Sequence, residues 1–306
     1  MRLRLGYSPC PNDAFIFHAM THGLVGDVAD TGGPGTPVGD PGDGADDLEF
    51  DVVLDDVEAL NRAVADGALD VAKISYHAYG YVSERYLLLP AGGALGRGVG
   101  PLVVARTPDV DLRGKRVAIP GGRTTANLLL RLWQPEGVEL VELRYDRIMP
   151  AVVAGEVDAG LVIHESRFTY PSYGLSALVD LGAWWEREVG HLVPLGAIAA
   201  RRDLGPTMHA RLTNRIRASL RYAWDHPRAS AAYVAEHAQE MSPDVRDRHI
   251  ALYVNEFSMD VGTEGAAAVR ALLSQATERG LFPPVNEPIF AGEGTFAPYR
   301  EGTERG

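Results

Sequence analysis

The sequence predicts an α/β protein built of two lobes. Segments with the apolar patterns of strands alternate with segments of helical periodicity through the first half of the chain, which is typical of βαβ units in a largely parallel sheet. At 306 residues the chain is long enough for two lobes that each bury a core of their own. A short internal echo also recurs at a separation of about one lobe.

The expected elements follow one another in a regular order. The run LRLGYS reads as a strand and NDAFIFHAMTHG as a helix, and FDVVLDD, EALNRAVADG and LDVAKISY continue as strand, helix and strand. From about Pro206 onward the pattern becomes mostly helical, with helix starts at Ser242-Pro243 and between Asp260 and Glu264. The helices expected there lie within residues 208–226, 228–240, 242–258 and 263–280.

The middle of the chain is expected to cross between the lobes. An extended LVVA strand, residues 102–105, follows a glycine-rich run, and RVAIP leads into the apolar helix of GGRTTANLLLRLW. The glycines of GRGVG lack the G-x-G-x-x-G spacing and precede a proline and a strand, which argues against a dinucleotide site. We therefore expect one lobe from residues 1–104 and 202–306, and the other from residues 105–201.

Residues 65–77 and 154–165 echo one another. Each copy reads as a helix end, a glycine turn, an acidic residue and a buried strand. The alignment pairs Gly67 with Gly155, Asp70 with Asp158, and Tyr76 with His164. Two interpretations stay open, namely equivalent positions in two similar lobes or the generic chemistry of a helix-to-strand turn.

Composition excludes several classes of partner. The net charge of -12 argues against a nucleic-acid backbone, and the absence of an apolar run of eighteen residues argues against a membrane span. The first residues reach proline before an apolar secretory segment develops, and Cys10 is the single cysteine, so we expect a cytoplasmic protein. Residues 27–47 hold six Asp and no Lys or Arg, which predicts a flexible, dispensable loop. The oligomeric state is left open.

Three positions could carry chemistry. His164 follows a buried strand, where ligands bind in open α/β sheets, and is either a catalytic base or the capped end of that strand. The GGRTT turn opens a helix whose free N–H groups suit a carboxylate or phosphate, although Thr124 and Thr125 could simply cap that helix. Lys73 interrupts an apolar strand and needs a partner, an anionic ligand or an exposed face.

Two further patterns are weaker. Cys10 could be a nucleophile, but its flanking prolines favour a stiff turn that delivers Asn12 and Asp13 as helix caps. His18 and His22 have the spacing of a metal-binding helix face without a third ligand, so we expect a solvated face and no metal.

Seven segments of the chain together point to a known family. They are LGYSPCPNDAFIF, DDVEALN, AKISYHAYG, GGALGRGVGPLVVAR, GLVIHESRFTYPSYGL, LGAWWE and PLGAIAARRDLG. With them the chain resembles the 1,4-dihydroxy-6-naphthoate synthase family of the futalosine route to menaquinone, from residue 3 to about residue 280. The resemblance implies the two-lobed fold of type 2 periplasmic binding proteins with the ligand between the lobes. It also implies a lyase that converts cyclic dehypoxanthine futalosine to 1,4-dihydroxy-6-naphthoate and releases dihydroxyacetone.

The resemblance also implies roles for particular residues. The family's proton acceptor falls on His164, and no metal or redox cofactor is implied. Contacts to a small carboxylate substrate fall on Lys73, Ile74, Ser75, Thr125 and Ala126. The long acidic segment and Ala14, where threonine is common, depart from the family pattern.

Other functions stay open beside this one. A related chorismate dehydratase and a non-catalytic solute-binding protein would share the fold, and the acidic loop could serve protein interaction.

Overall fold

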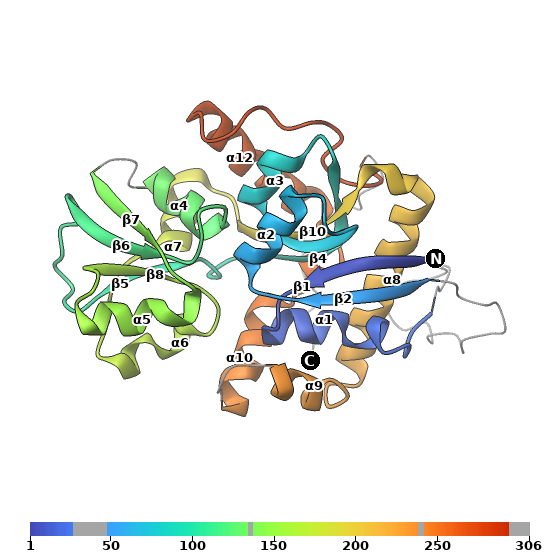
Figure 1. Ribbon diagram of the computed structural model, residues 1–306, viewed down its shortest axis with the longest axis horizontal. Helices are drawn as coiled ribbons and strands as arrows, with labels where there is room; N and C mark the ends of the chain where they lie inside the picture. Colours follow the sequence, from blue (N-terminus) through green and yellow to red (C-terminus); the bar gives the residue numbers. More distant parts are fainter. Residues whose placement is uncertain (27–47, 134–136, 238–241, 294–306) are drawn as a thin grey trace.

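The computed structural model describes residues 1–26, 48–133, 137–237 and 242–293, which form two lobes (Figure 1). Each lobe has a five-stranded mixed sheet with helices on both faces. This confirms the predicted two-lobed α/β fold. The acidic segment 27–47 lies outside the described residues, so its expected flexibility and dispensability stay predictions.

The first sheet combines four strands from residues 2–96 with one strand from residues 193–201. Its strand order is β2-β1-β3-β10-β4. Strands β2, β1 and β3 are parallel, whereas β10 is antiparallel to both of its neighbours. The strands are β1 (Arg2–Tyr7), β2 (Glu49–Leu54), β3 (Val71–Ser75), β4 (Tyr86–Gly96) and β10 (Val193–Arg201).

The second sheet has the same plan. Its order is β7-β6-β8-β5-β9, with three parallel strands followed by an antiparallel strand, β5, and then β9. The strands are β5 (Leu102–Ala105), β6 (Lys115–Ile119), β7 (Val138–Glu142), β8 (Ala159–Val162) and β9 (Ser176–Asp180).

The echo in the sequence marks equivalent places in the two sheets. Strands β3 and β8 each occupy the central position, and the glycine turn before each has positive φ, 72° and 76°. The carboxylate of Asp70 accepts from the amide of Arg4 at 2.8 Å, and the carboxylate of Asp158 accepts from the amide of Arg116 at 2.9 Å. The echo therefore reflects two similar lobes.

Helices bury both faces of each sheet. In the first lobe, α1 (Pro11–Thr21) and α8 (Gly205–Asp225) cover one face, while α2 (Val57–Ala65), α3 (Tyr76–Val82) and α12 (Gly262–Glu278) cover the other. In the second lobe, α5 (Tyr145–Ala154) covers one face, and α4 (Thr125–Trp133) and α7 (Leu181–Val189) cover the other. Short turns of helix complete the lobes, namely α6 (Ser166–Thr169), η1 (Tyr170–Tyr173) and η2 (Arg202–Leu204).

The C-terminal helices begin where the sequence predicted. Ser242 caps α10 (Pro243–Tyr253), and Asp260 accepts from the amide of Gly262 at the start of α12. The expected helix 242–258 is two helices in the structure. The first ends at Tyr253, and Asn255 caps the second, α11 (Glu256–Met259). Helix α9 (Ala231–His237) precedes them.

The chain crosses between the sheets twice. It leaves the first sheet after β4, builds β5 to β9, and returns at β10. The predicted boundary placed residues 193–201 in the second lobe, whereas β10 pairs with β3 and β4 and thus belongs to the first sheet. No local sequence pattern reveals that β10 pairs antiparallel with strands so distant from it in the sequence.

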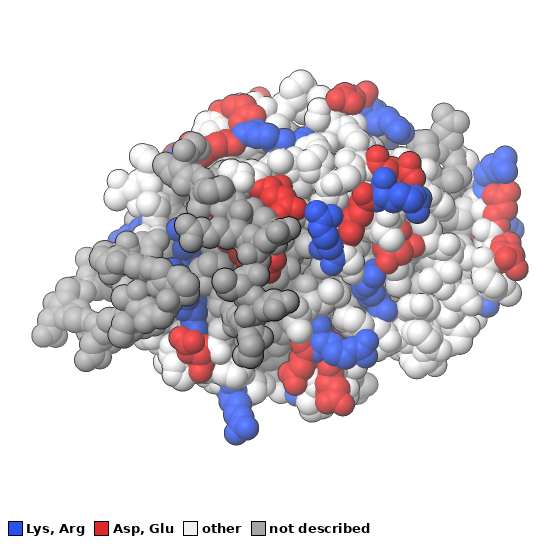
Figure 2. Space-filling view, turned by 180° about the vertical axis from the view of Figure 1, so that it is seen from behind, with Lys and Arg blue, Asp and Glu red and all other residues white. Residues whose placement is uncertain are grey.

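Over the coloured residues of the face in Figure 2, Lys and Arg side chains are interspersed with Asp and Glu and form no continuous basic surface of the kind that binds nucleic acid. Within the described ranges, none of the helices combines the length and apolarity that a membrane span requires.

Candidate active site

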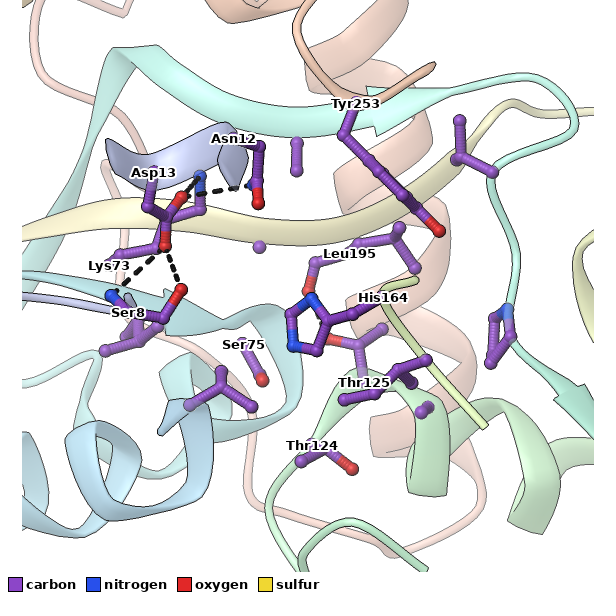
Figure 3. A pocket seen from close by; sticks show the side chains of 18 of the residues that line it. Ser8, Asn12, Asp13, Lys73, Ser75, Thr124, Thr125, His164, Leu195 and Tyr253 are labelled. Atoms are coloured by element: carbon purple, nitrogen blue, oxygen red, sulfur yellow. Dashed lines mark hydrogen bonds and ion pairs between the residues drawn. The ribbon is translucent and has the colours of Figure 1, made fainter. Parts of the chain in front are cut away.

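A cavity between the two lobes brings together all six residues expected at the site. It contains about 700 Å³ of empty space, part of it open to solvent. The six lie on both sides of the cavity, on β3, at the start of α4 and beyond β8 (Figure 3). They are Lys73, Ile74, Ser75, Thr125, Ala126 and His164.

His164 stands in an unusual backbone conformation. It lies just beyond β8 with φ of 55°, and among the described residues no other non-glycine residue has positive φ. A left-handed conformation is strained for a side chain and recurs at functional sites, where the surrounding structure enforces it. The half-buried ring lines the cavity, with the ring of Tyr145 packed edge-on at 5.3 Å between centroids.

The surroundings keep the His164 imidazole neutral. Burial lowers its pKa below the ordinary value, and the carboxylates of Glu165, Asp13 and Asp56 offset this only in part. A neutral imidazole near pH 7 is a proton acceptor. His164 therefore has the position and the protonation state of a general base.

Lys73 is paired within the protein. Its ammonium group lies 3.2 Å from Asp13 Oδ1 and donates to the carbonyl of Gly92 at 2.7 Å. Both members of the pair are at least 95% buried, since their exposed fractions are 5% and 2%. Of the three alternatives that the sequence left open for Lys73, the structure shows a partner, because Asp13 balances its charge.

The start of α1 holds Asp13 in place. Its Oδ2 accepts from the hydroxyl of Ser8 at 2.6 Å and from the amide of Ser8 at 3.2 Å. The sequence suggested that Asn12 and Asp13 cap α1. In the structure they do not, because their side chains turn to the cavity wall. Cys10 occupies the cap position without a side-chain cap bond, and burial raises the pKa of its thiol, which disfavours a nucleophilic thiolate.

The glycine turn before α4 is partly occupied by carboxylates of the protein. Glu58 of α2 accepts from the amide of Arg123 at 3.1 Å, and Glu142 accepts from the amide of Gly122 at 3.2 Å. The hydroxyl of Thr124 caps α4 by accepting from the amide of Asn127 at 3.2 Å. The threonine-cap interpretation is therefore confirmed for Thr124.

Two amides at this helix start remain for a ligand. The Thr125 hydroxyl donates to the carbonyl of Leu195 at 2.6 Å and so joins α4 to β10. Among the hydrogen bonds of the described residues, none uses the amides of Thr125 or Ala126, and both residues line the cavity. The first amides of a helix, at the positive end of its dipole, suit a carboxylate.

The end of β3 adds a hydroxyl. The amide of Ser75 donates to Asn61 Oδ1 at 2.9 Å, and its Oγ accepts from Asn61 Nδ2 at 3.3 Å. These bonds leave the hydroxyl hydrogen of Ser75 available to a ligand. The side chain of Ile74 is fully buried in the core beside the cavity and contributes to its apolar wall.

Sequence reasoning missed residues that come from distant segments. Asn12, Asp13, His249 and Tyr253 also line the cavity. The i, i+4 spacing of His249 and Tyr253 on a helix was the only available indication that they share a face. The rings of His18 and His22 are tilted by 32° with their centroids 4.5 Å apart, yet no three His, Cys, Asp or Glu side chains in the described part of the chain are grouped to hold a metal ion.

The fold and the cavity define a class: a two-lobed protein of the periplasmic-binding-protein fold with a cavity between its lobes. The alkanesulfonate-binding protein SsuA from Xanthomonas axonopodis pv. citri, solved bound to MOPS, shares this fold with a TM-score of 0.68 at 15% identity, over 94% of this chain and 97% of that chain. Protein AF1704 from Archaeoglobus fulgidus is more similar, with a TM-score of 0.82 at 36% identity, over 92% of this chain and 98% of that chain.

The chain belongs to the menaquinone biosynthesis family, whose model matches residues 3–278. A 1,4-dihydroxy-6-naphthoate synthase from Thermus thermophilus is 52% identical over 94% of this chain and 98% of its own. The synthase of the same name from Streptomyces coelicolor is 50% identical over 94% of this chain and 98% of its own. These matches confirm the resemblance and place the chain among enzymes.

Proposed function

We propose that the protein is a carbon–carbon lyase that converts cyclic dehypoxanthine futalosine to 1,4-dihydroxy-6-naphthoate and dihydroxyacetone. The observation that carries the proposal is a neutral histidine, His164, held in a strained conformation opposite the free amides of a helix start. The two relatives at about half identity support the choice of product, since both are named for the synthesis of 1,4-dihydroxy-6-naphthoate. A cytoplasmic location and a small carboxylate ligand are part of the same proposal.

The cavity provides for both parts of such a substrate. The carboxylate would accept from the amides of Thr125 and Ala126, and a ring oxygen would accept from the hydroxyl of Ser75. Val57 and Leu60 of α2 supply apolar surface for the ring system. In this scheme Lys73 holds Asp13 in the polar wall of the cavity. The pair as a whole is neutral, so it presents no net charge to the ligand.

The reaction is a retro-aldol cleavage started by His164. The imidazole takes the proton of a substrate hydroxyl, and the electron pair of that O–H bond forms a carbonyl. The neighbouring carbon–carbon bond breaks, and its electron pair passes to the ring, which becomes aromatic and accepts a proton. Proton transfer of this kind contributes about 10² to 10⁴ in rate. The sequence of events neither consumes nor releases redox electrons.

The decisive experiment incubates the purified protein with cyclic dehypoxanthine futalosine and detects the naphthoate by mass. His164→Ala should lower turnover about 10²- to 10⁴-fold and keep substrate binding, because the amides of Thr125 and Ala126 remain. His164→Asn is the matched control for backbone strain, since asparagine tolerates the left-handed conformation and is no base. A His164→Ala enzyme that turns over at near the wild-type rate would refute the role of His164.

The same assay separates the alternatives. A chorismate dehydratase would consume chorismate and leave the futalosine derivative intact, and a solute-binding protein would bind without forming product. The wild-type rate should also fall at acid pH as His164 is protonated, at a pH below the ordinary pKa of histidine because burial lowers its pKa. An acid limb that persists in the residual activity of His164→Asn would assign it to another group.

A further inference from the structure

His249 presents a buried nitrogen that has no partner within the part of the chain that the structure describes. This residue of α10 is 1% exposed and lines the cavity. Its Nε2 lies 3.2 Å from Asn12 Oδ1, whereas its Nδ1 has no hydrogen-bond partner among the described residues. Buried polar atoms without partners are rare in folded proteins, and each one calls for an explanation.

The neighbours of Asn12 decide which nitrogen of His249 carries the proton. Asp13 binds the ammonium of Lys73 and is an acceptor only, so the group of Asn12 that lies 3.2 Å from Asp13 Oδ1 is the amide nitrogen. The oxygen of Asn12 then faces His249 and must accept from it. The chain Lys73, Asp13, Asn12 therefore fixes His249 as the tautomer with hydrogen on Nε2.

A neutral imidazole with hydrogen on Nε2 has a lone pair on Nδ1. His249 stays neutral, because burial and the neighbouring His164 lower its pKa well below the ordinary value. Nδ1 is thus a hydrogen-bond acceptor to which no described group of the protein donates. Figure 3 shows Asn12 and Asp13 on the wall from which this chain of contacts starts, with His164 projecting toward the same space.

The two histidines lie together on the cavity wall. Their rings are nearly parallel, at 15°, with centroids 5.9 Å apart. A ligand that places one hydroxyl on His164 would bring a neighbouring hydroxyl of the same carbon chain toward His249. Because Nδ1 can only accept, it would favour a hydroxyl and disfavour a carbonyl or carboxylate at that position.

We propose that His249 orients the substrate by accepting a hydrogen bond through Nδ1 from a hydroxyl next to the one that His164 deprotonates. This rests on the proposed function, since it takes the substrate to be polyhydroxylated beside the bond that breaks. His249 selects and positions the substrate, and His164 performs the proton transfer. Asn12 is a positioning residue that acts by holding the tautomer.

The first test reads the tautomer and the contact directly. Protein carrying His164→Asn and ¹⁵N-labelled histidine should bind cyclic dehypoxanthine futalosine and consume it slowly enough for the spectra to be recorded. The same protein with His249→Gln added identifies the His249 resonances. Without ligand, hydrogen should reside on Nε2 at neutral pH. Added substrate should shift the Nδ1 resonance toward that of a hydrogen-bonded acceptor, with the Kd measured by calorimetry. Hydrogen on Nδ1, or an Nδ1 resonance that stays in place while substrate binds, would overturn the proposal.

The second test is kinetic. His249→Gln keeps an amide N–H that can donate to Asn12, but its acceptor, the amide oxygen, does not occupy the position of the ring Nδ1. The contact to the substrate hydroxyl should therefore be lost, and kcat/KM should fall roughly two- to tenfold, as for a neutral hydrogen bond. The acid limb set by His164 should not move. Wild-type kcat/KM in a folded His249→Gln enzyme would overturn the proposal, and if that variant does not fold, the resonance measurement decides alone.

The two proposals fail in different ways. A wild-type protein that neither binds nor converts the substrate refutes the proposed function and, with it, this contact. A wild-type protein that makes the naphthoate while both His249 measurements are negative refutes the contact alone.

Discussion

Replacing either member of the Lys73–Asp13 pair should destabilise the protein, and the two changes should differ. Asp13→Asn keeps the shape but leaves the buried ammonium of Lys73 with only the carbonyl of Gly92 at 2.7 Å. Removing one partner of a buried ion pair costs about 3–5 kcal/mol. Lys73→Met leaves the Asp13 carboxylate with three donors, two from Ser8 and one from Asn12. That change should cost less, about 1–3 kcal/mol.

Urea unfolding of the two variants and of the double variant measures this difference. The double variant should recover part of the loss of Asp13→Asn, because no unpaired charge remains. If Lys73→Met proves as costly as Asp13→Asn, the donors around Asp13 do not compensate its charge. The argument from the hydrogen-bond geometry would then be wrong.

Three other changes test separate contacts. Burial raises the pKa of Glu58, so the folded protein gains stability as pH falls through that pKa; Glu58→Gln should therefore be more stable than wild type at pH 7, with the gain shrinking in acid unfolding titrations. Burial lowers the pKa of His77 to about 4, so the unfolded chain binds a proton at a higher pH than the folded chain does. The free energy of unfolding of wild type should therefore fall by up to about 3 kcal/mol between pH 7 and 4, and His77→Asn should not show this loss. Thr125→Val removes the bond to Leu195 and should lower the free energy of unfolding by about 1–3 kcal/mol, with substrate Kd from calorimetry little changed.

Local patterns in the sequence predicted what depends on neighbours along the chain. The helix start at Ser242-Pro243, the strand that ends before His164 and the repeated glycine turns all arise from contacts within a few residues. Their backbone geometry follows from side-chain capping and from glycine's freedom at positive φ. These features were accordingly found where they were expected.

Partners chosen by the folded chain could not be predicted in the same way. Lys73 needed a partner, but nothing near it in sequence identified Asp13, which reaches it from the first turn of α1. The glycine turn suited an anion, and the anion at the Arg123 amide is Glu58 from the other lobe. Nothing in the sequence around His249, on a C-terminal helix, indicates that its Nε2 contacts Asn12 of the first helix. The sequence shows which side chains carry charge or can form hydrogen bonds. Packing of the folded chain then decides which of the many compatible partners each of them contacts.

The return of β10 to the first sheet has a consequence for synthesis on the ribosome. Strands β5 to β9 are complete once residue 180 has emerged, so the second lobe can fold while the first still lacks the strand between β3 and β4. Until Arg201 follows, the nascent chain exposes two unpaired apolar strand edges, which attract chaperones and other unfinished chains. The last strand to arrive also carries Leu195 and Gly196 of the cavity. A ligand of the cavity can therefore stabilise only a chain in which β10 is already in place.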